Sequence, residues 1–472
     1  MNCDYWRLDA RSLSDAYAAG SLSPLEVVRS VLARVHEVQP LLNPMTHLDE
    51  AGALAAARHS ESRWQAKAPR SRLDGVPLTV KDNITVRGMP CRWGSRLYHD
   101  YLPSDDETPV ARLRGAGAVL LGKTNVPEFT LLGYTDNLLH GPTRNPWDPA
   151  LTPGGSSGGA VTAVASGIGP IALATDGGGS IRRPCSHTGV VGLKPGEGRV
   201  PRANGLPELL PGLEVIGPVA RTVEDLLLVL EVIGPRRAPR QTAPARSLRV
   251  ACWRQIGDGP VDPEVLDSFD GALDQLRQDG HEVEVLPAPE VVERFNREAW
   301  PVLAGAGLER VLLPFAERLG EAGVSDRLTP AMAAMWATAR HLPASAEPEA
   351  WVVVAQLRAA MAALFDRYDL LVTPSAAALQ WPARETHPHI IDKRPAGPRA
   401  HAVFTAFANA CGLPALALPT APAASGLPIG MQLVGCPDSE EWLCALGRRW
   451  ELLQPWRHRW PDRQQLQGHL SP

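Results

Sequence analysis

The sequence has almost no excess of charge of either sign. Lys and Arg number 47 against 51 Asp and Glu, which gives a formal net charge of −4 over 472 residues. Apart from a short arginine cluster near Arg236, no basic stretch stands out, so nucleic-acid binding has no electrostatic support. We therefore expect no nucleic-acid partner.

Long apolar runs are also lacking. Residues 1–7 show no basic segment followed by an apolar stretch, and no run of eighteen apolar residues occurs elsewhere. We expect no membrane partner and a cytoplasmic location.

Cysteine and histidine patterns that bind metals are missing too. Seven cysteines form no C-x-x-C pair, and an odd number cannot all pair within one chain. Cys185 lies five residues after Ser180, but no suitably placed histidine accompanies it, so a packed thiol is favoured over a nucleophile and His187 is expected to be structural. His387 and His389 lack a third and fourth ligand at usable spacing, so no metal is predicted.

What the sequence does contain is an alternation of helical and strand patterns, with 44% hydrophobic residues as in ordinary globular proteins. Residues 1–70 look mainly helical, and a capping box at Ser23 marks the start of one helix within them. Further helices are expected at 110–114, 159–166, 222–233 and 263–278, and strands at 76–80, 118–121, 171–174, 248–251, 281–286, 370–373, 414–418 and 430–434. The pattern predicts an α/β fold with one large mixed β-sheet flanked by helices on both faces.

Two proline-rich segments interrupt this pattern and are expected to lack regular structure. Residues 234–246 are interpreted as a solvated loop that joins two halves of the sheet. Residues 381–398 are either a surface loop or a lid over the functional site, and the sequence does not choose between them.

One motif resembles a phosphate-binding loop. Residues 117–124 match G-x-x-x-x-G-K-[ST], whose chemistry needs a flexible glycine loop that turns its backbone amides inward. Residues 118–121 (AVLL) are apolar and look like a strand, so we expect no nucleotide binding.

Two glycine-rich clusters are the strongest functional signal. Residues 154–159 (GGSSGG) contain Ser156, residues 176–182 (DGGGSIR) contain Ser180, and no histidine stands beside either serine. Flexible loops would explain such clusters, but ordered apolar segments flank both, which favours a defined site. A serine needs a base to become a nucleophile, and Lys81, at the end of a predicted strand, supplies one if burial keeps it neutral. Acyl transfer, most simply amide hydrolysis, is the chemistry indicated.

Four segments in order resemble the amidase signature family: residues 73–83, 122–129, 141–148 and the serine-glycine block as far as 195. Weaker similarity occurs at 368–374, 411–415 and 426–435. The resemblance implies the amidase signature fold and a single amidase domain over residues 1–472, with the helical segment 1–70 and a signature core at 73–195.

The resemblance also implies roles for individual residues. Ser180 would be the nucleophile, Ser156 a bridging serine held by a cis peptide bond, and Lys81 the terminal base. The backbone N–H groups of Gly177, Gly178, Gly179 and Ser180 form a suitable nest for an oxyanion. The residues expected to hold this relay in place are Ser157, Thr175, Asp176 and Arg182.

The expected function is that of a free-standing amidase, which cleaves a C–N bond of a small carboxamide or related compound through an acyl-enzyme. No cofactor is expected, the partner is a small-molecule amide, and a homodimer is the candidate assembly. The amide stays open among aryl, aliphatic, urea-derived, hydrazide and lactam-oligomer classes. Departures from the family pattern at Gly177, 185–187 and 196–197 leave the relay intact but affect the pocket wall.

Two alternatives remain. The first is the glutaminase A subunit of a tRNA-dependent amidotransferase, although residues 308–351 look like the variable region of free-standing amidases. The second is a catalytically silent binding protein, against which the intact set of Lys81, Ser156 and Ser180 argues.

Overall fold

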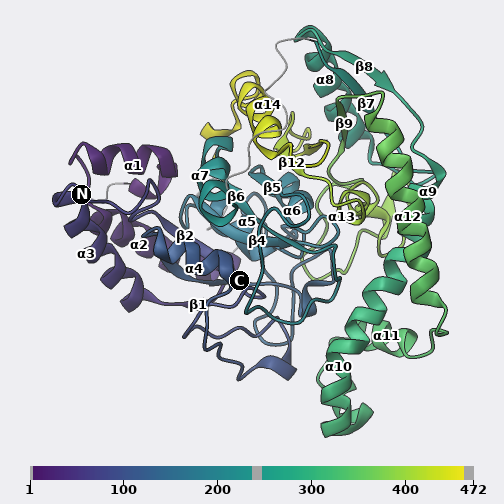
Figure 1. Cartoon of the computed structure of the whole chain (residues 1–472), viewed down its shortest axis with the longest axis horizontal. Helices are drawn as coiled ribbons and strands as arrows, with labels where there is room; N and C mark the ends of the chain where they lie inside the picture. The colour runs from purple at the N-terminus through teal and green to yellow at the C-terminus, as the bar shows by residue number, and fades with distance from the viewer. Residues whose placement is uncertain (1–3, 236–246, 462–472) are drawn as a thin grey trace.

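A mixed β-sheet forms the centre of the molecule (Figure 1). The computed structural model describes residues 4–235 and 247–461. Within these residues, 11 strands form one sheet in the order β1-β3-β2-β4-β6-β5-β12-β13-β9-β7-β8, and β10 and β11 form a separate hairpin. The strands are β1 Met45–Leu48, β2 Pro77–Lys81, β3 Val119–Thr124, β4 Ile171–Asp176, β5 Val191–Lys194, β6 Val215–Ala220, β7 Arg249–Cys252, β8 Glu282–Val285, β9 Leu370–Pro374, β10 Ile390–Ile391, β11 Arg394–Pro395, β12 Ala415–Pro419 and β13 Gly430–Val434.

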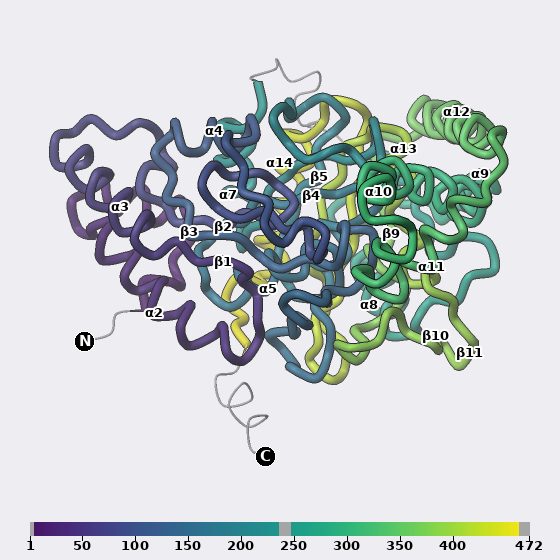
Figure 2. Tube along the Cα trace, turned by 90° about the horizontal axis from the view of Figure 1, so that it is seen from below, coloured from purple at the N-terminus to yellow at the C-terminus, as the bar shows by residue number. Residues whose placement is uncertain are grey.

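Helices pack on both faces of this sheet. On β4, Ile171 and Leu173 pack into one core with α7 (Val223–Ile233), whereas Ala172 and Ala174 pack into another with α5 (Gly158–Ala165). The alternation follows from the two-residue period of a strand. The helices are α1 Ala10–Ala18, α2 Pro24–Leu42, α3 Glu50–Gln65, α4 Thr108–Gly115, α5 Gly158–Ala165, α6 Arg182–Thr188, α7 Val223–Ile233, α8 Pro263–Gln278, α9 Glu290–Arg294, α10 Trp300–Ser325, α11 Pro330–Ala339, α12 Ala346–Phe365, α13 Ala406–Ala410 and α14 Glu440–Leu453. Figure 2 shows the chain trace from below, with the amino-terminal helices α2 and α3 at one end and α9 and α12 at the other.

Strand direction places the ends of three neighbouring strands together. β2 pairs in parallel with β3 on one side and with β4 on the other. In parallel pairs the carboxyl ends lie at the same edge of the sheet, which is where open α/β sheets place their sites. Lys81, at the end of β2, therefore lies beside the end of β4 and the glycine loop that follows it.

The predicted fold class is confirmed, and most predicted strands and helices are present with small shifts at their ends. The mainly helical segment 1–70 also contains β1, an edge strand antiparallel to β3. Strands β5 and β6 were not predicted. β6 contains Pro218, a residue that argues against a strand inside a sheet because it cannot donate a backbone hydrogen bond.

The two proline-rich segments differ from expectation in different ways. Residues 236–246 of the first lie outside the described residues. The second contains the β10–β11 hairpin, so the expectation of no regular structure was wrong there. Asp392 and Lys393 take φ values of 47° and 58° in its two-residue turn, a conformation that usually calls for Asn or Gly.

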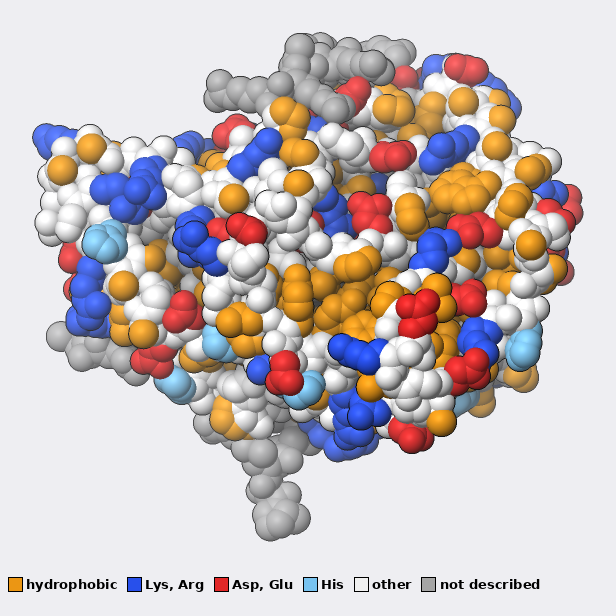
Figure 3. Space-filling view, turned by 60° about the horizontal axis from the view of Figure 1, so that its bottom comes forward, with side chains coloured by type: hydrophobic (Ala, Val, Ile, Leu, Met, Phe, Trp, Pro, Cys, Tyr) orange, Lys and Arg blue, Asp and Glu red, His pale blue; other side chains and the backbone are white. Residues whose placement is uncertain are grey.

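The surface and the longest apolar helix bear on possible partners. On the face drawn in Figure 3, Lys and Arg are interspersed with Asp and Glu, and hydrophobic side chains gather near the middle. Among the described residues, α12 alone is long and apolar enough to cross a membrane by length and composition. A helix packed in a core passes the same test, and Val354 and Leu357 of α12 are buried in the core shared with α10.

Candidate active site

Lys81 is the centre of a buried polar cluster. Its side chain is fully buried, and its Nζ donates to Ser156 Oγ and Thr175 Oγ1, each at 2.8 Å, and to the Thr175 carbonyl at 3.2 Å. Asn83 Nδ2 lies 3.2 Å from the same Thr175 hydroxyl. The sequence-predicted lysine, bridging serine and Thr175 therefore meet in one place.

Burial changes the acid–base behaviour of this lysine. Desolvation lowers the pKa of Lys81 to about 7, although the negative charges of Glu214 and Asp176 act in the opposite direction. An ammonium group loses its hydration shell when it is buried, which favours the neutral amine. Near neutral pH Lys81 is thus able to accept a proton.

The position before Ser156 in its loop has room only for glycine. The Gly155–Ser156 peptide bond is cis, and a Cβ on Gly155 would lie 2.4 Å from the Tyr134 carbonyl oxygen. The next residue joins this loop to the second glycine cluster, because the Ser157 N–H donates to the Ser180 carbonyl and its hydroxyl to the Thr175 carbonyl, both at 3.2 Å.

Ser180 lies between β4 and α6 and shares a pocket with Ser156. The residue is 7% exposed. Among the described contacts, no hydrogen bond joins the two serine hydroxyls. The pocket is lined by Thr130, Leu131, Ser156, Thr175, Gly177, Gly178, Ser180, Arg183, Leu209, Leu210, Glu214, Trp300 and Arg399.

The glycine loop before Ser180 presents backbone donors to this pocket. In the described part of the chain, the N–H groups of Gly177, Gly178 and Ser180 have no hydrogen-bond partner. Gly179 differs, because its N–H donates to Asp176 Oδ1 at 2.6 Å, so this donor is already occupied. Its φ of +112° and its closeness to Thr405 Oγ1 require glycine at this position.

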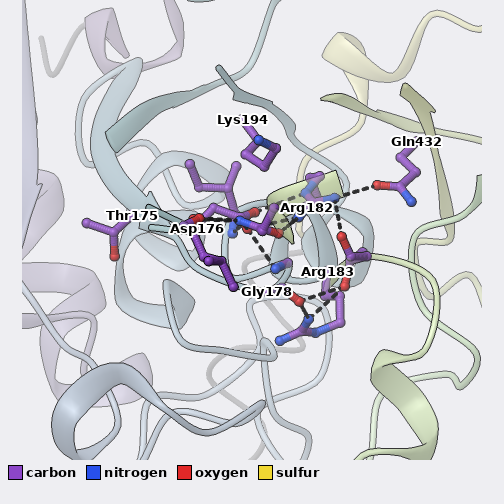
Figure 4. Close-up of polar contacts among 12 residues, drawn as sticks. Thr175, Asp176, Gly178, Arg182, Arg183, Lys194 and Gln432 are labelled. Carbon is purple, nitrogen blue, oxygen red and sulfur yellow. Dashed lines mark hydrogen bonds and ion pairs between the residues drawn. The ribbon is translucent and has the colours of Figure 1, made fainter. Parts of the chain in front are cut away.

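The ion pair of Asp176 and Arg182 stabilises the glycine loop before Ser180 (Figure 4). Both side chains are fully buried, and Arg182 forms two hydrogen bonds with the carboxylate at 2.9 and 3.0 Å. The carboxylate also accepts the Ile181 N–H at 3.0 Å. Burial alone would raise the pKa of Asp176, but the Arg182 charge and these bonds outweigh it and hold that pKa well below its usual range.

Several residues from the carboxyl-terminal part complete the site and were not predicted. Arg182 donates to Gln432 Oε1 at 2.8 Å and to the Thr405 carbonyl at 2.9 Å (Figure 4). Asn409 Nδ2 donates to the Asp176 carbonyl at 2.8 Å. The only sequence signal for these partners is weak family similarity. One similar segment, 426–435, contains Gln432, and the other, 411–415, follows shortly after Thr405 and Asn409.

Three further residues singled out by the sequence, Cys185, His187 and Lys123, are buried. Cys185 is buried, and burial raises the pKa of its thiol well above the usual range. His187 is buried with Nε2 3.2 Å from the Ala378 carbonyl oxygen. Lys123, in the segment that resembles a phosphate-binding loop, lies in strand β3 and donates to backbone carbonyls. The described residues contain no group of three or more His, Cys, Asp or Glu placed to hold a metal.

Comparison with known proteins adds independent information. The Amidase family model matches residues 26–444. The A subunit of the glutamyl-tRNA(Gln) amidotransferase of Roseiflexus sp. (strain RS-1) is 33% identical over 96% of this chain and 98% of its own.

Two solved structures are similar over nearly their whole length. A bacterial aryl acylamidase of the amidase signature family has a TM-score of 0.87 at 26% identity and covers 98% of this chain and 99% of its own. A 6-aminohexanoate cyclic dimer hydrolase, solved with its substrate, has a TM-score of 0.86 at 28% identity with the same coverage.

Proposed function

This chain belongs to the amidase signature family of C–N hydrolases, and on that premise we propose that it is a free-standing amidase acting on small carboxamides. The observation that carries the proposal is the 2.8 Å hydrogen bond from Lys81 Nζ to Ser156 Oγ, in a pocket that also contains Ser180. A buried amine, a bridging hydroxyl and a second hydroxyl form a route for a proton away from the attacking oxygen.

In the acylation step, Ser180 Oγ attacks the amide carbonyl carbon while Ser156 accepts its proton and passes one to neutral Lys81. The carbonyl oxygen becomes an oxyanion, for which the free N–H groups of Gly177, Gly178 and Ser180 are the donors. The Gly179 N–H is not a donor to this oxyanion, because it already donates to the Asp176 carboxylate.

In the following steps the same groups work in reverse. Ser156 returns the proton to the leaving amine, so that the C–N bond breaks and an ester to Ser180 remains. Water attacks this ester and gives up its proton through Ser156 to Lys81. The proton then returns through Ser156 to Ser180 Oγ as the ester C–O bond breaks, so that the acid leaves and the free serine and neutral Lys81 are restored. Four residues hold the serine loops and the lysine in position. Ser157 and Thr175 do so through hydrogen bonds, and Asp176 and Arg182 through their ion pair.

A second candidate is the glutaminase component of a tRNA-dependent amidotransferase. The observation in its favour is the 33% identity over 96% of the chain to the Roseiflexus protein. The match covers nearly the whole chain, so the overall identity alone does not separate the two candidates. The amide hydrolysis step would be the same in both.

Turnover by the isolated polypeptide separates the candidates. We expect the purified chain to hydrolyse simple aryl and aliphatic amides without any added protein or RNA, and Ser180→Ala to abolish this activity. A chain that is inert towards a broad amide panel, but cleaves L-glutamine once partner subunits and charged tRNA are added, would overturn the free-standing assignment and leave the relay chemistry in place.

A further inference from the structure

Arg399 stands in the wall of the pocket that holds Ser180. It precedes the short 3₁₀ turn Ala400–Ala402 and is partly buried. Its guanidinium carbon lies 3.4 Å from the centroid of the Trp300 ring, so the cation is stacked on the first residue of α10. Trp300 itself is 5% exposed.

Trp300 connects this cation to the reacting centre. A Cβ on Gly178 would lie 2.9 Å from Trp300 Nε1, so the indole is packed against the loop that carries the proposed oxyanion donors. One indole ring therefore separates Arg399 from the glycine loop. Ser180, Trp300 and Arg399 all line the same pocket, so a substrate that occupies the pocket lies among them.

The guanidinium of Arg399 has no acceptor among residues 4–235 and 247–461. Within the described residues it makes no hydrogen bond and no ion pair, and its Nε is buried without a partner. Burial and the nearby charge of Arg183 lower the pKa of Arg399 to about 9, which still leaves it charged at neutral pH. A partly buried cation with unfilled donors is costly unless a ligand supplies acceptors.

The other charged side chains of the pocket, Arg183 and Glu214, have partners within the protein, although Arg183 Nε, like Arg399 Nε, is buried without one in the described part of the chain. Arg183 donates to the Gly178 carbonyl and, at 2.8 Å, to Thr405 Oγ1. Glu214 lies 3.3 Å from Arg202 and accepts from Asn83 at 3.2 Å. The charge that remains for a ligand is therefore positive.

We infer that Arg399 binds a carboxylate of the substrate, and that the preferred substrates are small amides that carry a free carboxylate. The planar fork of a guanidinium matches the two oxygens of a carboxylate, and stacking on Trp300 holds the fork in one orientation. The inference rests on the proposed amidase function and names the substrate class of the same site.

The test uses pairs of amides that differ only at the far end. Succinyl, glutaryl and adipoyl p-nitroanilides are compared with the same compounds in which a carboxamide replaces the carboxylate. 4-Acetamidobenzoate and 4-acetamidobenzamide place the same difference on the leaving amine. We expect wild-type kcat/KM to favour the best carboxylate over its carboxamide by roughly tenfold to hundredfold.

The variants assign this preference to Arg399. Arg399→Gln should remove the preference by lowering kcat/KM for the carboxylate about tenfold or more relative to the carboxamide, and Arg399→Lys should retain part of it. Arg318, which stacks on Phe315 at 5.3 Å outside the pocket, offers a matched control, and Arg318→Gln should change neither substrate. No preference in the wild type, a preference that survives Arg399→Gln, or an equal loss with both substrates would overturn the inference.

A binding measurement keeps this test separate from catalysis. Glutarate, which has no amide, should bind the Ser180→Ala variant in calorimetry, and its Kd should rise at least about tenfold when Arg399→Gln is added. If no amide is hydrolysed, the proposed function fails, yet glutarate binding still decides the role of Arg399. Equal glutarate affinity with and without Arg399 would refute it.

Discussion

Lys81 and Ser156 lie 75 residues apart in the chain, yet both are buried and Lys81 Nζ donates to Ser156 Oγ at 2.8 Å. The contact exists because β2 ends beside β4, and because the loop of Ser156 is tied to β4 through Ser157 and Thr175. A lysine in this position assists catalysis only as the neutral amine, and this requirement makes the site sensitive to pH.

With amides that carry no carboxylate, activity should rise with pH through a single ionisation near 7 and then reach a plateau. Below the pKa of about 7 Lys81 carries a proton and cannot take another, whereas above it the amine is free. The pH dependence of kcat/KM measures this. Lys81→Ala should lose most activity, and the same inflection in its residual rate would show that another group is the base.

Thr175 should tune that ionisation. Its hydroxyl accepts a hydrogen bond from Lys81, which favours the charged lysine, so Thr175→Val should move the inflection of kcat/KM to lower pH by roughly 0.5–1 unit. Thr175→Ser keeps the acceptor and is the matched control. An inflection that moves upward in the valine variant would contradict the hydrogen-bond assignment.

The buried pair of Asp176 and Arg182 should be important for stability. Arg182→Met leaves a buried carboxylate without its partner, a change that typically costs about 3–5 kcal/mol in the free energy of unfolding. Arg310 and Glu347 form an exposed pair at 2.9 Å, and Arg310→Met should cost about 1 kcal/mol or less. Urea denaturation of both variants compares them, and equal losses would mean that the buried pair has no special structural role.

The part of the site that the sequence predicts is the part with local patterns. Lys81 ends a strand of alternating apolar residues, so its position follows from the two-residue period of a strand. Both serines stand in glycine clusters between ordered elements, so their positions follow from the preference of glycine for turns. Asp176 and Arg182 are six residues apart and belong to the same motif.

The remaining site residues depend on the order of strands in the sheet. Gln432, on β13, accepts a hydrogen bond from Arg182, which lies 250 positions earlier in the chain. Thr405 accepts one from Arg183, 222 positions earlier. Trp300 and Arg399 stand in segments whose local sequence shows no functional pattern, and only tertiary packing brings them to the pocket. No spacing rule within one sequence contains that information.

The most direct test of the relay is the position at which a fluorophosphonate attaches. We expect intact-protein and peptide mass spectrometry to find one adduct, on Ser180, and we expect Ser180→Ala to lose both the adduct and about 10⁴-fold or more of kcat. An adduct on any other residue, or full labelling and turnover in Ser180→Ala, would contradict the assignment of Ser180 as the nucleophile activated through Ser156 and Lys81.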